Sequence, residues 1–104
     1  MMVVRDAAER FVREIRANDV NAALLDRLPA LGFKDCWLVA GCLFETIWNL
    51  QSGRPPREFI RDYDVFYFDP DDLSYDAEDR AIRRLSDACA DLDATLELKN
   101  EARV

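Results

Sequence analysis

The run Ile60–Phe68, within the segment EFIRDYDVFYFDPDD (Glu58–Asp72), most constrains how this chain can fold. Isoleucine, valine, tyrosine and phenylalanine dominate the run and Pro70 follows it, a pattern that predicts a β-strand. Both of its sides are largely apolar, which indicates a central strand covered on two faces. Two aspartates, Asp62 and Asp64, nevertheless occupy alternate positions inside it. Because carboxylates are costly to bury, either the strand is exposed where they lie or a cation meets them there.

Hydrophobic periodicity predicts the elements around this strand. Apolar residues at helical spacing indicate helices near residues 4–15, 20–31, 43–52 and 76–89. Asn18 or Asp19 is expected to cap the second helix, and Ser74 or Asp76 the last. Short strands are expected over Cys36–Gly41 and Ala94–Lys99. The order α-α-β-α-β-α-β indicates one small α/β or α+β domain over residues 1–104.

Composition and charge exclude several classes of protein. Half of the residues are hydrophobic, which excludes a disordered chain. The net charge is −7, from 21 acids and 14 bases, and an acidic surface repels the phosphate backbone of a nucleic-acid duplex. The chain has no histidine. Histidine-based general base catalysis, Ser-His-Asp triads and histidine-rich zinc sites are therefore excluded.

The cysteines indicate the compartment. Cys36, Cys42 and Cys89 match no zinc-binding spacing, and their odd number argues against a disulfide framework. We interpret them as reduced thiols, mostly buried, in a cytoplasmic protein. No apolar stretch approaches the roughly 20 residues that a membrane span requires, so no membrane association is expected.

The acids of the strand suggest metal-dependent chemistry. Residues i and i+2 of a strand share a face, so Asp62 and Asp64 point the same way. Glu97 lies on another strand, and all three carboxylates converge if the two strands are neighbours. Hard oxygen donors of this kind suit Mg²⁺ or Mn²⁺. Two such ions activate an attacking oxygen and neutralise a leaving oxygen, which suits nucleotidyl transfer.

Phosphate groups would need a second anchor. Gly41 and Cys42, where a strand turns into a helix, can offer backbone N–H groups and the positive end of the helix dipole. Arg54, Arg57 and Arg61 precede the aspartates, and Arg61 is the candidate for contacting a nucleotide. Each of these features alone has a structural interpretation, as a turn glycine or a solvated arginine.

The two tryptophans of the chain are open to two interpretations. Trp37 and Trp48 could stack on a base, but each lies on an apolar pattern. We therefore expect both side chains to pack in the core.

The segments AGCLFETIWN, RDYDVFYFD and LELKNEARV, taken together, resemble a bacterial nucleotidyltransferase-like family of the DNA polymerase β-type superfamily. The resemblance implies a small mixed sheet flanked by helices. It also implies Asp62, Asp64 and Glu97 as metal-binding catalytic residues, and Gly41 with Cys42 as the phosphate-side turn. The domain of the family is expected to continue past Val104.

The chain departs from the family pattern at three places. Cys42 follows the turn glycine where glycine or serine is common, Phe44-Glu45 replaces Arg-Asn, and Glu101 replaces an amide. Two functions are therefore weighed. The first is a Mg²⁺- or Mn²⁺-dependent nucleotidyltransferase that uses a nucleoside triphosphate and an acceptor, with a small molecule or protein favoured over nucleic acid. The alternative is a non-catalytic binding module that retains the fold.

Overall fold

The computed structural model describes residues 2–104, with side chains from Asp6 onward. The elements follow the order α1 (Met2–Ile15), α2 (Asp19–Leu31), β1 (Trp37–Leu38), α3 (Ala40–Gln51), β2 (Asp62–Tyr67), α4 (Tyr75–Ala88), β3 (Thr95–Asn100) and the short 3₁₀ helix η1 (Glu101–Arg103). The α+β class and the predicted order of helices and strands are confirmed. None of the described helices has the combination of length and apolar character needed to traverse a bilayer.

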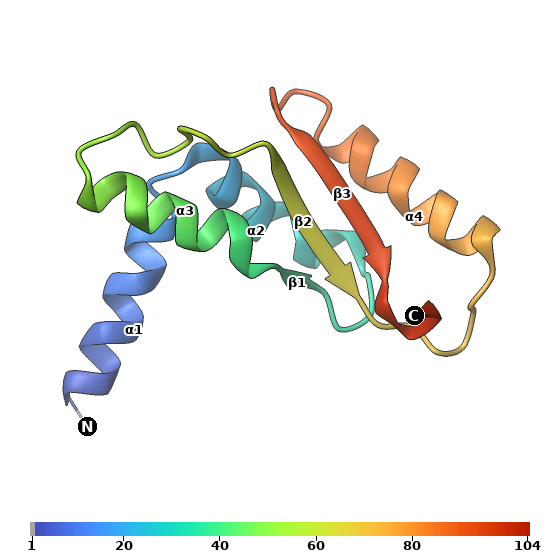
Figure 1. Ribbon diagram of the computed structural model, residues 1–104. Coiled ribbons are helices and arrows are strands. Elements are labelled where there is room, and N and C mark those ends of the chain that lie inside the picture. The colour runs from blue at the N-terminus through green and yellow to red at the C-terminus, as the bar shows by residue number, and fades with distance from the viewer. Residues whose placement is uncertain (1) are drawn as a thin grey trace.

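The described strands form one mixed sheet in the order β1-β2-β3 (Figure 1). β1 pairs with β2 in antiparallel orientation, and β2 pairs with β3 in parallel orientation. Parallel neighbours need a crossover connection, which α4 supplies between β2 and β3. The run Ile60–Phe68 therefore forms the central strand, as predicted, although its regular part is shorter.

In the described part of the chain, helices cover one face of the sheet and leave the other open. Tyr63, Val65 and Tyr67 of β2 point into the core, where Leu24 of α2 and Leu85 of α4 pack in the same cluster. Figure 1 shows the end of α2 behind β2, α4 alongside β3, and no helix in front of the two strands. The expectation that both faces of β2 are covered was therefore wrong. The face that bears the two aspartates is open, which avoids the cost of burying their charges fully.

The first strand is shorter than predicted. Instead of extending over Cys36–Gly41, β1 contains only Trp37 and Leu38, and Ala40 already begins α3. Val39 is the N-cap residue of α3, with an extended backbone. The backbone N–H of Val39 still donates to the carbonyl of Asp64 at 2.9 Å, which holds the start of α3 beside β2.

Buried polar side chains join α2, α3 and β2. Asn18 caps α2, as one of the two predicted candidates, by accepting from the backbone N–H groups of Val20 and Asn21. Its amide donates to Thr46 Oγ1 at 3.1 Å and to the Tyr63 hydroxyl at 3.0 Å. Thr46 in turn donates to the carbonyl of Cys42 at 2.7 Å. Since buried polar groups are costly when unpaired, this network fixes α3 relative to the strand that carries the aspartates.

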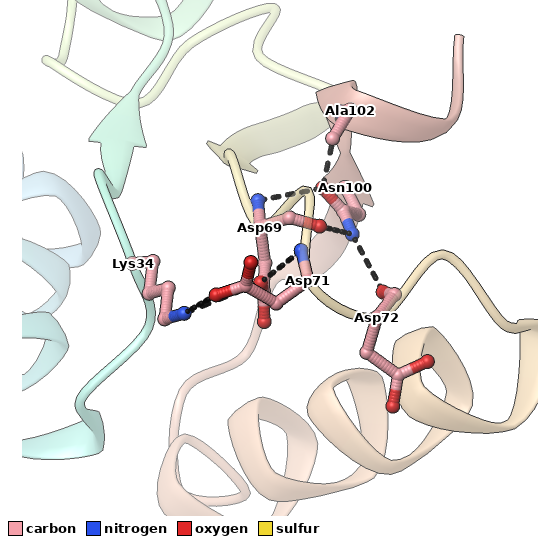
Figure 2. Close-up of polar contacts among 6 residues, drawn as sticks. All are labelled: Lys34, Asp69, Asp71, Asp72, Asn100 and Ala102. Carbon is pink, nitrogen blue, oxygen red and sulfur yellow. Dashed lines mark hydrogen bonds and ion pairs between the residues drawn. The ribbon is translucent and has the colours of Figure 1, made fainter.

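The turn after β2 is held by Asn100, the last residue of β3 (Figure 2). The side chain of Asn100 accepts from the N–H of Asp69 at 3.0 Å and donates to the carbonyl of Asp69 at 3.0 Å. It also accepts from Ala102 N–H at 3.1 Å, and its own backbone N–H donates to Glu78 at 2.9 Å. Ser74, one of the two predicted caps, caps α4 by accepting from Ala77 N–H. Asn100 therefore joins the ends of β2 and β3 to the start of η1.

Candidate active site

The register between β2 and β3 brings the acidic residues to one face of the sheet. Asp64 pairs with Glu97, and Asp62 pairs with Thr95, in parallel orientation. Paired residues of adjacent strands share a face, and residues i and i+2 share it too. Asp62, Asp64 and Glu97 therefore all lie on the open face, opposite the buried Tyr63 and Val65.

The carboxylates interact with one another electrostatically. The pKa of Glu97 is raised above its ordinary value, first because the protonated carboxyl can hydrogen-bond to Asp64, and then because the charges of Asp62 and Asp64 repel its ionised form. The Oδ1 atom of Asp64 is buried and has no hydrogen-bond partner among the described residues. An uncompensated carboxylate oxygen among like charges is unfavourable unless a cation joins it.

The carboxylate oxygens of Asp62, Asp64 and Glu97 are suitable ligands for a hard divalent cation. All three are carboxylate oxygens, which Mg²⁺ and Mn²⁺ prefer, and the unpartnered Asp64 Oδ1 provides an available ligand. Within the described side chains, however, no three acidic or cysteine groups stand close enough to form a complete metal site. Repulsion between ionised carboxylates favours such a separation, and a cation would have to draw them together.

The raised pKa of Glu97 gives the metal-free protein a specific pH dependence. A carboxyl with a folded-state pKa above its unfolded value contributes stability below the unfolded pKa, and this contribution is lost as pH rises through the folded pKa. We therefore expect Glu97→Gln, which stays neutral, to gain stability relative to the wild type as pH increases from about 4.5 toward 7. Urea unfolding in the presence of a chelator measures the difference.

Combining Glu97→Gln with Asp64→Asn tests the cause of the raised pKa of Glu97. In Asp64→Asn, the side chain that contributes most to the raised pKa of Glu97 no longer carries a charge. The pH-dependent gain in the free energy of unfolding from Glu97→Gln should therefore be smaller when Asp64→Asn is also present. An advantage that is equal at all pH values, or unchanged by Asp64→Asn, would contradict carboxylate repulsion as its origin.

The first turn of α3 lies beside the acidic face. Ala40, Gly41 and Cys42 occupy the first three helical positions, whose N–H groups have no partner within a helix. Val39 makes no side-chain hydrogen bond that would cap them. Gly41 is exposed, its φ is not positive, and a Cβ placed there would meet no atom of the described residues within 4 Å apart from its chain neighbours and its own helix backbone. Because neither backbone conformation nor packing requires glycine, this helix start has room for an anionic ligand.

The side chain of Cys42 does not share this exposure. It is only 4% exposed and packs in the core, where its thiol donates to the carbonyl of Val39 at 3.4 Å. Burial is the main cause that raises the pKa of the thiol to about 11. The thiol is therefore neutral near pH 7 and unsuited to nucleophilic attack. Only the backbone N–H of Cys42 remains a candidate for contacting phosphate.

The arginines before β2 differ in their contacts. Arg54 donates through Nε to Asn49 at 2.9 Å and lies 4.0 Å from Glu45. Arg57 donates to the carbonyl of Asp93. Within the described side chains, Arg61 has no hydrogen bond or ion pair and is exposed beside Asp62. Arg61 is thus the arginine of this group that is available to a ligand, and Glu45 is engaged by an arginine from the following loop.

The structure corrects the expectation for both tryptophans. Trp37 is 69% exposed and Trp48 is 59% exposed, so neither packs in the core. Trp37 pairs with Phe66 and therefore lies on the open face of the sheet. The buried side of α3 instead bears Cys42, Thr46 and Asn49, whose polar partners come from distant segments. Sequence reasoning missed Thr46 and Asn100, and it anticipated Asn18 only as a helix cap, because a buried polar side chain is recognisable only through its partner.

A mixed sheet with acids on two adjacent strands, placed beside an uncapped helix start, has the fold of a nucleotidyltransferase head domain. Residues 26–104 match a family model described as Nucleotidyltransferase, and the chain belongs to this family.

Comparison with solved structures supports the same fold. The chain is similar to a structure described as "The NMR structure of the protein reveals a CCA-adding enzyme head domain", with 33% identity and a TM-score of 0.69. The similarity covers 89% of this chain and 47% of that one, so this chain spans about half of the other's length. No curated protein matches the chain.

Proposed function

We propose that this domain transfers a nucleoside monophosphate from a nucleoside triphosphate to an acceptor, with the help of Mg²⁺ or Mn²⁺. The observation that carries the proposal is the pairing of Asp64 with Glu97 on an open face. This pairing gathers acids from distant parts of the sequence beside the uncapped start of α3. Membership of the nucleotidyltransferase family supports the same reaction class.

Each group has a distinct role in the proposed reaction. Asp62 and Asp64 would hold divalent cations, which neutralise phosphate charge and activate the attacking hydroxyl when bound. Glu97, whose pKa is raised by its acidic neighbours, would complete the metal site and help to accept the proton of the acceptor hydroxyl. The hydroxyl oxygen bonds to the α-phosphorus, and pyrophosphate leaves with the electron pair of the broken P–O bond.

The phosphate groups would lie between the carboxylates and α3. Backbone N–H groups of Gly41 and Cys42 would donate to phosphate oxygens, aided by the positive end of the helix dipole. Arg61 would add a charged contact at the other end of the aspartate pair. The net charge of −7 favours a small-molecule or protein acceptor over a nucleic acid.

The three cysteines bear on where the reaction takes place. Cys36, Cys42 and Cys89 are all free thiols. Because free thiols persist in reducing compartments, we place the protein in the cytoplasm.

A non-catalytic module remains the second candidate. It is favoured by the absence, within the described side chains, of three acidic or cysteine groups close enough to complete a metal site. In such a module the acidic face would bind neither nucleotide nor metal, and the fold would serve only as a scaffold.

A label-transfer assay separates the two functions. The protein is incubated with Mg²⁺ and each of the four nucleoside triphosphates labelled at the α-phosphate, together with separate pools of small metabolites, proteins and RNA. Transfer predicts label in one pool and equimolar pyrophosphate, both absent with Glu97→Gln. Asp87→Asn, which removes an exposed acid from α4, should transfer normally. Absence of transfer and of Mg²⁺-dependent nucleotide binding would favour the module.

A further inference from the structure

The open face of the sheet has an aromatic half next to its acidic half. Phe66 follows Asp64 by two positions on β2 and therefore shares its face, and Trp37 of β1 pairs directly with Phe66. Together with Val39 and Phe68, these rings line a shallow hollow of about 310 Å³. The hollow lies at the edge of the sheet, beside strand β1.

The rings of this hollow are unusually exposed for their size. Trp37 is 69% exposed and Phe68 is 48% exposed, whereas Tyr63 and Tyr67 on the opposite face are buried. Exposed aromatic groups gathered in one place mark interaction sites more often than isolated ones do. Trp and Phe rings offer flat surfaces on which another planar ring can stack.

The position of the hollow indicates which planar ring it receives. Trp37 and Leu38 lead through Val39 directly into α3, whose first turn is the proposed phosphate anchor. Val39 lines the hollow and precedes α3, and its N–H donates to the backbone carbonyl of Asp64, so the hollow and the helix start both lie beside the strand position that bears this aspartate. A ligand with phosphates at α3 and a tethered ring can therefore span both halves of the face.

We propose that this hollow binds the nucleobase of the nucleoside triphosphate, with the base stacked against Trp37 and Phe66. The inference rests on the proposed function, since the phosphates of the same ligand occupy the acidic half. Glu101 also lines the hollow, and its carboxylate has no hydrogen bond or ion pair with any described side chain. Nucleobases present N–H donors at their edges, which this carboxylate accepts. An apolar surface of a partner protein in the same hollow would offer the Glu101 carboxylate no hydrogen-bond donor.

The two tryptophans make this proposal directly measurable, because the chain contains only Trp37 and Trp48. Trp48→Phe leaves Trp37 as the single fluorescent reporter, and Trp37→Phe leaves Trp48. Addition of Mg²⁺ with ATP should quench the emission of Trp37 and leave that of Trp48 unchanged. Adenosine alone, at higher concentration, should also quench Trp37. Inorganic tripolyphosphate with Mg²⁺ lacks a base and should quench neither.

Affinities provide the second readout. Trp37→Ala should weaken ATP binding by about 5- to 150-fold, the range typical of losing one base–aromatic stack, and leave tripolyphosphate binding unchanged. Trp48→Ala, a matched loss of an exposed tryptophan from α3, should leave both affinities unchanged. Because Trp37 is largely exposed, its removal creates no cavity, and far-UV circular dichroism verifies the fold of each variant.

The outcomes separate this inference from the proposed function. If ATP and tripolyphosphate bind equally and Trp37→Ala changes neither affinity, the nucleobase site is wrong while the phosphate site stands. If neither ATP nor tripolyphosphate binds in the presence of Mg²⁺ but adenosine still quenches the emission of Trp37, the proposed function fails and the nucleobase site stands. Trp37 emission that responds to protein concentration and not to adenosine would show a second copy in the hollow and overturn the inference.

Discussion

Asp64→Asn is expected to abolish Mg²⁺-dependent nucleotide binding without destabilising the metal-free protein. The amide keeps the shape of the side chain but removes the charge that a divalent cation requires. In the wild type, nucleotide and Mg²⁺ at 100 times the dissociation constant add about 2.7 kcal/mol to the free energy of unfolding. For a domain of this size, that raises the melting temperature by on the order of 10 °C. The variant should show no such rise.

The stability of the metal-free protein provides a second test of this prediction. Asp64 lies in register with Glu97, and its Oδ1 atom is buried without a partner. Replacing it by a neutral amide removes repulsion, so the metal-free variant should be at least as stable as the wild type. Opposite effects on the free and the ligand-bound protein identify a ligand-binding group, since a purely structural residue would destabilise both states.

Catalysis should be affected more strongly than binding. Nucleotidyl transfer by Asp64→Asn should fall by about 10³-fold or more, the scale on which active sites lose activity when a group that stabilises developing charge is removed. The rate of pyrophosphate release measures it, with Asp87→Asn as the matched acid-to-amide control on α4. Transfer at more than a tenth of the wild-type rate would show that Asp64 is not a metal ligand.

Asn100→Asp should be the most destabilising isosteric change in the domain. Asn100 is 1% exposed, and its amide donates to the carbonyls of Asp69 at 3.0 Å and Asp72 at 3.4 Å (Figure 2). An ionised aspartate cannot donate, and it places a buried charge near Glu78. We expect a loss of about 3 kcal/mol in the free energy of unfolding at pH 7, measured by urea denaturation.

The pH dependence of this variant tests the physical reason. An aspartate in acidic surroundings has a folded-state pKa above its unfolded value, so the deficit is small at low pH and grows as pH rises through the folded pKa. The stability gap to the wild type should therefore narrow as pH falls from 7 to about 4. A gap that stays constant over this range would show that packing, and not charge, causes the loss.

Local sequence patterns predicted much of the fold. The Tyr, Val and Phe content of Ile60–Phe68 and the alternation within Ala94–Lys99 indicated two strands, and helical spacing indicated the helices around them. The N-caps Asn18 and Ser74 were each among two predicted candidates. Capping could be predicted because it depends on residues at most three positions apart in the sequence. The first strand was overpredicted because Ala40 and Gly41 suit a strand end as well as a first helical turn.

The sequence by itself determined that Asp62 and Asp64 share a face, since that follows from the two-residue period of any strand. Only the tertiary structure decided that Glu97 joins them, because register depends on how distant segments pack in three dimensions. It also decided that this face stays open, with Trp37 exposed upon it. Burial depends on which helices cover a strand, and no local pattern records which face they cover.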